Sequence, residues 1–462
     1  MTTLRQAVAS EMPRAIEDLK AYCGQPSVAA QNLGIADTVE LVRRLFTEEG
    51  ARVDVLENGG GNPILHVEFE GPSERTLLFY DHYDVQPPEP LEEWTTPPFQ
   101  PVVRDGRLFA RGSSDNKGDL ICRLAAVRAL KRVYGHVPCR VKFLIEGEEE
   151  VGSPTFAGSV ERYKDRFQAD ACIWEFGMKD ETERPLLYGG LKGICYLQFT
   201  VRTMDVDLHS SMAPIVHNPA WRLVWALASL KGPDGRVLIP GFYENAGGPT
   251  DRDLAYIERI PWDVAEFKRY HGIRELWQER GGRTLSVPEM VRDYLFEPTC
   301  TICGLEAGYA GPGTKTVLPR EASAKVDFRL VGRMSPQEVL QKVRAHLDSL
   351  GYDDIQVESL GPEHPYQTSL ENPFVDLVWQ TAKEAYGKDP VLYPTAAGSG
   401  PMYPVGNILE VPIISTGCSY WGSGAHAPDE NIRLEDFEQG AFHMALLLER
   451  FGTTSEERRR QG

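Results

Sequence analysis

Short apolar runs that end abruptly in polar residues recur along the N-terminal part of the chain. Such runs cover residues 53–56, 64–69, 77–80, 141–145 and 171–174. Their length and composition predict strands buried in a sheet. Helical periodicity predicts one helix over 35–49, ending at Gly50, and another from Leu120 to Val133. Strands that alternate with helices are typical of an α/β fold, in which ligands gather at the carboxyl ends of the strands.

The pattern changes between about Tyr196 and Ser359. Strands are predicted over 196–202 and 322–330, separated by a long stretch rich in Pro and Trp. A helix is predicted from Ser335 to Leu350, because Ser335 is a suitable N-cap, a proline follows it and Gly351 ends the helix. These elements predict a small α+β lid inserted into a larger domain. We expect the larger domain to comprise 1–195 and 361–462, and the lid 196–360.

Composition restricts the classes of function. The 462 residues are enough for two domains with their own cores. A net charge of −18, with no basic tract, argues against nucleic acid or an anionic membrane as a partner. The chain has no apolar span of membrane length, and its first 19 residues lack a signal core, which favours the cytoplasm. The eight scattered cysteines are expected to be reduced.

Two candidate metal ligands stand near the ends of predicted elements. His82 follows the apolar run 76–80, and Asp84 is placed to orient it by accepting a hydrogen bond from the second ring nitrogen. Alone, a His-x-Asp pair at a strand end is often incidental. Asp115 lies in a glycine-containing loop before the helix at Leu120, where it can offer two oxygens to two cations. A simple N-cap would explain Asp115 equally well.

Three further segments add acidic and imidazole groups. The run 141–145 leads into an acidic turn, 146–150, that holds four glutamates. These carboxylates repel one another unless cations or protons neutralise them. The run 171–174 delivers Glu175, and a glycine loop near the C-terminus carries His426. A solvated acidic turn would account for the charges of 146–150, but not for their position directly after an apolar strand.

These segments, in this order, resemble the two-metal peptidase family of aminoacylase, carboxypeptidase G and carnosine dipeptidase, and the long insert resembles the carnosine dipeptidase branch. The resemblance implies a mixed-sheet α/β catalytic domain with an inserted lid used for dimerisation. It also implies roles for single residues: Glu149 as the general base, Asp84 as the residue that orients a ligand, and His82, Asp115, Glu150, Glu175 and His426 as metal ligands. Asn116 replaces the aspartate that usually follows the bridging carboxylate of the family.

The ligand types agree with a hydrolytic metal site. Histidine and carboxylate oxygens suit Zn²⁺, which we expect, as well as Mn²⁺ or Co²⁺. Two such ions per subunit can hold a hydroxide between them and polarise a carbonyl group. Glu149 would then take a proton from the attacking water and pass it to the leaving amine.

Four residues of the lid and the following segment are candidate substrate groups. Alternation over 322–330 puts Arg329 on the polar face of its strand, free to face a cleft. The resemblance implies that Arg329 binds the C-terminal carboxylate of the substrate, which suits a guanidinium fork. It also implies that His209 reaches the active site of the neighbouring subunit and stabilises the oxyanion. Thr316 and Ser399 match substrate-contact positions.

Three functions compete. The favoured one is a dipeptidase or carboxypeptidase that hydrolyses dipeptides or short peptides with a free C-terminal carboxylate. A deacylase of N-acyl amino acids would use the same metals and base, and would differ in the pocket for the acyl chain. A non-catalytic binding protein is disfavoured because Glu149 and the inferred ligands are present. The expected partners are a small peptide or N-acyl amino acid and a second copy of the chain, in a homodimer formed through the lid.

Overall fold

The computed structural model describes residues 3–277 and 285–453. Its chain divides into two units. Unit 1 consists of Met1–Gly190, Gln367–Pro394 and Pro401–Gly462, and unit 2 consists of Leu191–Tyr366 and Thr395–Gly400. Most of unit 2 is therefore one insertion in the sequence of unit 1. The chain passes between the units within β10 (Gly190–Leu191) and β17 (Tyr366–Gln367), and again before residue 395 and after residue 400.

Unit 1 is built on an eight-stranded sheet with the order β1-β2-β6-β3-β7-β19-β9-β18. The strands β6, β3, β7 and β19 are parallel to one another, whereas β1 and β2 are antiparallel, as are β2 and β6. The predicted mixed α/β sheet is thus confirmed. The strands are β1 (Arg52–Asn58), β2 (Gly61–Phe69), β3 (Ser73–His82), β6 (Cys139–Glu146), β7 (Ala171–Trp174), β9 (Leu186–Tyr188), β18 (Val391–Tyr393) and β19 (Ile413–Ser415).

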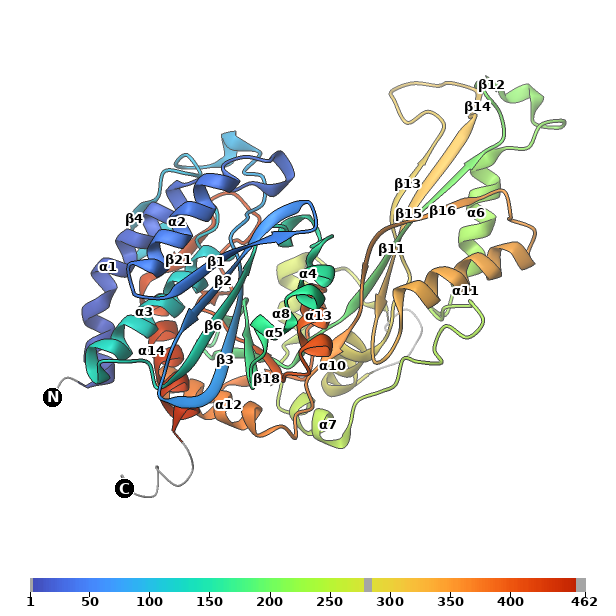
Figure 1. The fold of residues 1–462 in the computed structure, drawn as a ribbon. Coiled ribbons are helices and arrows are strands. Elements are labelled where there is room, and N and C mark those ends of the chain that lie inside the picture. The colour runs from blue at the N-terminus through green and yellow to red at the C-terminus, as the bar shows by residue number, and fades with distance from the viewer. Residues whose placement is uncertain (1–2, 278–284, 454–462) are drawn as a thin grey trace. The chain divides into compact units, whose positions relative to one another are not determined.

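Helices cover both faces of this sheet (Figure 1). The helices α1, α3, α12 and α14 pack on one another, α2 packs on β1 and β2, and α4 contacts β1 and α13. No helix in the described part of the chain is long and apolar enough to cross a membrane. The helices of unit 1 are α1 (Leu4–Gly24), α2 (Ile35–Thr47), α3 (Lys117–Tyr134), α4 (Phe156–Arg162), α5 (Lys164–Phe167), α12 (Pro373–Tyr386), α13 (Met402–Ile408) and α14 (Leu434–Gly452).

The central strands read as continuous apolar runs because helices cover both of their faces. In β3, every residue from Thr76 to His82 is buried. Aromatic rings fix neighbouring strands to each other: Phe79 of β3 lies 5.0 Å from Phe143 of β6, between ring centroids, and Tyr80 stacks on Trp174 of β7. This packing holds the carboxyl ends of three parallel strands at one edge of the sheet.

Short strands complete unit 1. They pair as β4 with β5, β5 with β21, and β8 with β20. Their bounds are β4 (Val102–Arg104), β5 (Arg107–Phe109), β8 (Met178–Lys179), β20 (Ser419–Tyr420) and β21 (Asn431–Arg433).

Unit 2 has an antiparallel four-stranded sheet with the order β13-β15-β11-β16, against which α6 and α11 pack. Its core includes Phe199, Phe328, Leu223 and Val343, all fully buried. Ser335 caps α11 as predicted, accepting a hydrogen bond from the backbone N–H of Glu338. The elements are β11 (Gly193–Arg202), β12 (Leu208–His209), α6 (Pro219–Leu230), α7 (Asp251–Ile257), α8 (Val264–His271), α10 (Val287–Phe296), β13 (Thr301–Ala307), β14 (Val317–Leu318), β15 (Glu321–Leu330), α11 (Pro336–Ser349) and β16 (Gln356–Glu363).

Candidate active site

The predicted metal ligands of unit 1 come from adjacent elements of its sheet. His82 is the last residue of β3, Glu175 follows β7, and Glu150 lies in a single 3₁₀ turn, Glu149–Val151, after β6. Asp115 precedes α3, and His426 lies in the loop between β20 and β21. Because β6, β3 and β7 are parallel neighbours, their carboxyl ends bring these side chains to one edge, as the α/β arrangement predicts.

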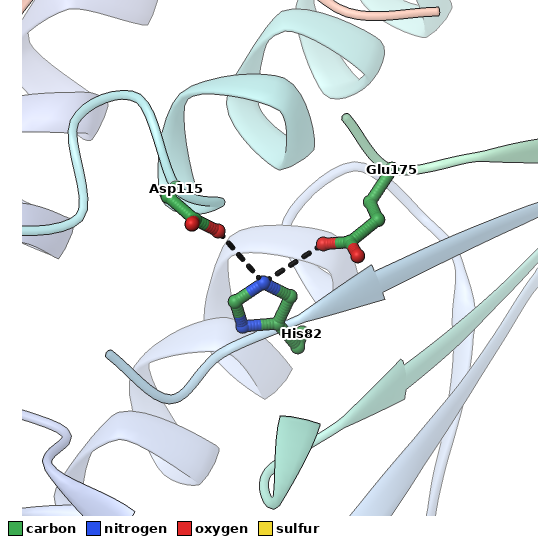
Figure 2. A group of neighbouring side chains, drawn as sticks. All are labelled: His82, Asp115 and Glu175. Carbon is green, nitrogen blue, oxygen red and sulfur yellow. Dashed lines mark hydrogen bonds and ion pairs between the residues drawn. The ribbon is translucent and has the colours of Figure 1, made fainter. Parts of the chain in front are cut away.

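The first group of ligand atoms gathers around the His82 ring (Figure 2). Nε2 of His82 lies 2.8 Å from Oε2 of Glu175 and 3.1 Å from Oδ1 of Asp115. The three side chains present atoms that all lie within 4.8 Å of one another. His82 and Glu175 are buried, so this group is shielded from solvent.

A second group shares Asp115 with the first. Nε2 of His426 lies 3.0 Å from Oδ2 of Asp115 and 3.2 Å from Oε2 of Glu150. Asp115 therefore directs one carboxylate oxygen to each histidine. This is the arrangement expected of a carboxylate that bridges two cations.

The donor set fits two divalent cations. Each group combines one imidazole with carboxylate oxygens, which are ligands for Zn²⁺, Mn²⁺ and Co²⁺. Oε1 of Glu150 is buried, and within the described residues it has no hydrogen-bond partner. A buried carboxylate oxygen without a donor is costly, and a cation would satisfy it.

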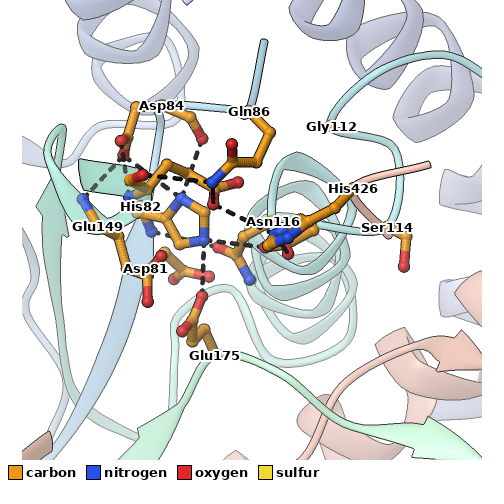
Figure 3. Close-up of polar contacts among 12 residues, drawn as sticks. Asp81, His82, Asp84, Gln86, Gly112, Ser114, Asn116, Glu149, Glu175 and His426 are labelled. Carbon is orange, nitrogen blue, oxygen red and sulfur yellow. Dashed lines mark hydrogen bonds and ion pairs between the residues drawn. The ribbon is translucent and has the colours of Figure 1, made fainter. Parts of the chain in front are cut away.

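Glu149 lies at the same edge, with its backbone shown in Figure 3. Burial raises the pKa of Glu149 well above the usual range of a glutamate, and the charge of Glu175 raises it further. A carboxylate with a raised pKa is a better proton acceptor. Glu149 lies at the edge of the sheet where the resemblance implies the general base.

Asp84 connects His82 with the acidic turn in a way that differs in part from the prediction. Nδ1 of His82 lies 3.0 Å from the main-chain oxygen of Asp84 and 3.4 Å from its carboxylate oxygen Oδ1. The carboxylate instead accepts hydrogen bonds from the backbone N–H groups of Glu149 and Glu150, at 3.3 and 3.0 Å (Figure 3). Asp84 thus holds His82 through its main chain and the acidic turn through its side chain.

Asn116 is compatible with the site although it replaces an aspartate of the family pattern. Its side-chain oxygen accepts a hydrogen bond from the backbone N–H of His82 at 3.2 Å (Figure 3). An amide oxygen and a carboxylate oxygen both serve as acceptors for this bond.

A buried ion pair between Arg111 and Glu430 supports the second group. Oε1 of Glu430 accepts hydrogen bonds from the backbone N–H groups of Ser114 and Asp115, at 2.8 and 2.9 Å. Oε2 accepts from the N–H of Gly112 and from Nη1 of Arg111, at 2.8 and 2.9 Å. Nη2 of Arg111 donates in turn to the main-chain oxygen of His426 at 3.3 Å. The pair therefore connects the loops that carry Asp115 and His426.

A second buried guanidinium supports the first group. Nη1 of Arg123, on α3, donates to the main-chain oxygen of Tyr80 and to Oδ1 of Asp81, at 2.6 and 2.7 Å. Nη2 donates to the main-chain oxygen of Trp174 at 2.9 Å. Arg123 thus connects the ends of β3 and β7 immediately before His82 and Glu175. Sequence reasoning missed these arginines and Glu430, since residues far apart in the chain give no sign that they pair.

The loop of His426 has an uncommon backbone. His426 has a φ of +65°, in the left-handed region that residues other than glycine seldom adopt. Its backbone is fixed by Arg111, and its side chain is about half exposed.

The candidate substrate residues of unit 2 form two pairs. Nη1 of Arg329, on β15, donates to Oγ of Ser399 at 2.8 Å, and Nε donates to Oδ2 of Asp327 at 3.0 Å. In the other pair, Oγ1 of Thr316 lies 3.3 Å from Nε2 of His209, and both residues are exposed. The structure thus brings together Arg329 with Ser399 and His209 with Thr316, each within unit 2.

Known peptidases are similar to this chain in sequence and in fold. A family model described as "Peptidase family M20/M25/M40" matches residues 78–450. A metallo-carboxypeptidase of Sulfolobus solfataricus has a solved structure that is 33% identical, with a TM-score of 0.90 over 95% of this chain and 99% of that chain. The Beta-Ala-His dipeptidase of Mus musculus is 28% identical, over 84% of this chain and 80% of its own length. The Cys-Gly metallodipeptidase of Schizosaccharomyces pombe is 26% identical, over 90% of both chains.

The family model spans most of the chain and includes both ligand groups, the acidic turn and all of unit 2. The fold, the types of candidate ligand and the residues that the family model matches all indicate the same family. The chain belongs to peptidase family M20/M25/M40 and is a peptide-bond hydrolase.

Proposed function

We propose that this protein is a two-metal dipeptidase that hydrolyses dipeptides or short peptides with a free C-terminal carboxylate. One observation carries the proposal: Asp115 directs one oxygen to His82 and the other to His426, at 3.1 and 3.0 Å. A carboxylate shared between two ligand groups suits a dinuclear hydrolase, and relatives of the chain are named as dipeptidases. These relatives do not favour the deacylase alternative.

Each of the two ligand groups would hold one ion. His82, Asp115 and Glu175 would hold one divalent cation, and Asp115, Glu150 and His426 the other. Zn²⁺ is the ion we propose, with Mn²⁺ or Co²⁺ as substitutes that the same donors accept. When bound, such ions act as Lewis acids that polarise the scissile carbonyl and lower the pKa of a water molecule.

The remaining steps fall to side chains. Glu149 takes the proton of the attacking water and delivers it to the leaving amine. Asp84 holds the backbone of Glu149 and Glu150 in place through its carboxylate. Arg329, paired with Ser399, binds the C-terminal carboxylate of the peptide.

Unit 2 is assigned the role of a lid through which two copies form a homodimer in the cytoplasm. His209 and Thr316 would then contact substrate in the partner's active site, with His209 donating a hydrogen bond to the oxyanion. Light scattering on the purified protein tests the dimer. A monomeric mass at assay concentrations would contradict it. In a dimer, His209→Ala should lower kcat by about 10²- to 10³-fold, without a change in mass.

Hydrolysis of defined substrates tests the main proposal. Protein stripped of metal and reloaded with Zn²⁺, Mn²⁺ or Co²⁺ is incubated with dipeptides, tripeptides and N-acyl amino acids, and products are identified by mass spectrometry. We expect release of amino acids from free-amine dipeptides, lost with Glu149→Gln and kept with Glu92→Gln, an exposed control. Cleavage of acylated compounds alone would point to a deacylase, and cleavage of nothing with any metal would refute the proposal.

A further inference from the structure

A pocket of about 300 Å³ lies beside Asp115 in unit 1. Its volume is at the small end of the range for ligand pockets. One wall follows Glu175, and the other belongs to the segment that leads to His426. The lining residues include Ser114, Asp115, Met178, Ser419, Tyr420 and Trp421.

The walls offer an apolar surface with no free charge. Asp115 is the one ionisable carboxylate among the lining residues, and it belongs to both ligand groups. The hydroxyls of Ser114 and Ser419 bond to each other at 2.7 Å, and that of Tyr420 donates to Asn431. A charged side chain in this pocket would therefore lose its hydration without gaining a partner of opposite charge.

Backbone contacts hold the two walls of the pocket in a fixed shape. Met178 and Ser419 are register partners in the pairing of β8 with β20. Trp421 donates its backbone N–H to the main-chain oxygen of Lys179 at 3.0 Å. Gly177 passes so close to the backbone of Gly417 that a Cβ at 177 would lie 2.0 Å from the nitrogen of Gly417. The pocket is therefore formed before a ligand arrives.

The large apolar side chains of the two walls are exposed, although their backbones are fixed. Trp421 is 50% exposed and Met178 is 36% exposed. Neither residue belongs to the buried core of unit 1. Apolar area that is exposed next to a candidate metal-binding carboxylate is typical of a ligand site.

We infer that this pocket binds an apolar side chain, up to the size of an aromatic ring, on the N-terminal residue of the substrate. The inference rests on the proposed peptidase function. In a dipeptide, the carbonyl that is attacked belongs to the N-terminal residue, so that residue's Cα is bonded directly to the reacting carbon. The pocket adjoins Asp115 and is therefore within reach of this side chain. The C-terminal residue is separated from the reacting carbon by the amide nitrogen and carries the carboxylate assigned to Arg329.

This preference would distinguish the chain from relatives whose names give their substrates. A β-alanyl residue has no side chain, and cysteine has a small one, so neither would fill a pocket of about 300 Å³. Filling an apolar pocket with additional methylene groups is worth roughly ten- to two-hundredfold in kcat/KM. We therefore expect Leu-Gly, Met-Gly and Phe-Gly to be cleaved at least tenfold faster than Gly-Gly, Glu-Gly or Lys-Gly.

Two variants test the pocket in the metal-loaded full chain. Trp421→Ala removes exposed wall area and should lower the ratio of kcat/KM for Phe-Gly over Gly-Gly at least fivefold. Met178→Glu places a carboxylate in the wall and should raise Lys-Gly relative to Leu-Gly at least tenfold, a gain that misfolding does not produce. Trp379→Ala, on α12 under the Lys383 ammonium, is the matched control and should leave both ratios unchanged. The kcat/KM values for Gly-Leu and Gly-Phe measure the effect of the side chain on the C-terminal residue.

The outcomes separate the pocket from the proposed function. Both predicted shifts in the ratios would support the pocket assignment. Cleavage of all dipeptides at rates that vary less than threefold with the N-terminal side chain would overturn it and leave the peptidase function intact. A change confined to Gly-Leu and Gly-Phe would overturn the assignment to the N-terminal residue. Failure to cleave any peptide with any of the three metals would overturn the proposed function, and with it the inference.

Discussion

Replacing Glu430 by glutamine should destabilise unit 1 strongly, although the change is nearly isosteric. Glu430 is fully buried and accepts four hydrogen bonds, one of them from the Arg111 guanidinium. In Glu430→Gln the oxygen can keep two of these bonds. The amide NH₂ then faces the N–H of Gly112 and Nη1 of Arg111. All three groups are hydrogen-bond donors, so neither of these two bonds can form.

The expected loss of stability follows from the charge of Arg111, which the substitution leaves unpaired. Arg111 is 1% exposed, so the variant holds a buried guanidinium without a counterion. Removing one partner of a buried ion pair costs about 3–5 kcal/mol. Because Glu430 also holds the backbone of Asp115, we expect affinity for the cation at the second group to fall by about 10- to 100-fold.

Urea unfolding followed by circular dichroism measures the stability, and competition with a chelator measures the cation affinity. Glu40→Gln is the matched control, since Glu40 pairs with Arg43 on the exposed face of α2. Such a surface pair contributes about 0–1 kcal/mol. A loss of less than about 1 kcal/mol in Glu430→Gln, equal to that of the control, would refute the reasoning.

The remaining predictions concern catalysis, pH and metal. Glu149→Gln should lower kcat by about 10²- to 10⁴-fold with unchanged metal content by elemental analysis, and a loss of metal would contradict the base role. Arg329→Ala should remove a preference of roughly 10- to 150-fold for free-acid peptides over their C-terminal amides, measured as kcat/KM. Burial lowers the pKa of His443 to about 3, whereas the histidine of the unfolded chain titrates near ~6.5. The free energy of unfolding should therefore fall as the pH drops from ~6.5 towards 3, by about 1.4 kcal/mol per pH unit from this group. In His443→Phe, unfolding curves measured across this range should show a smaller dependence of stability on pH. Chelation should lower the Tm, by the equivalent of about 2.7 kcal/mol per site when the free metal had been 100 times its Kd; an unchanged Tm would argue against bound metal.

The strands around the candidate metal centre could be predicted from the sequence for a physical reason. Strands β3, β6 and β7 are covered on both faces, so they appear as unbroken apolar runs, and the polar residues after them mark the edge of the sheet. Their parallel pairing then brings His82, Glu150 and Glu175 together. The predicted ligands follow from this geometry, while their catalytic roles stay predictions.

Other features had no local signature. Strand β13 is exposed along most of its length and β16 is largely so, and neither has the apolar alternation of a half-buried strand. Helix α6 begins with Asn218 as N-cap and Pro219 at its first position, a start signal that the surrounding Pro- and Trp-rich stretch obscured. The Arg111–Glu430 pair joins residues separated by most of the chain, so only the folded structure identifies it.

The order of the ligands along the chain has a consequence for synthesis on the ribosome. His82, Asp115, Glu150 and Glu175 precede unit 2, whereas His426 and its supporting Glu430 follow it. Domains generally fold as they emerge, beginning from the N-terminus. Unit 1 cannot be completed in this order, because two strands of its sheet, β19 and β18, and the helix α14 that packs on α3 also follow residue 366. A chain that ends between residues 191 and 366 would therefore lack part of the sheet that holds the first ligand group, as well as His426, and we expect neither group to form in it.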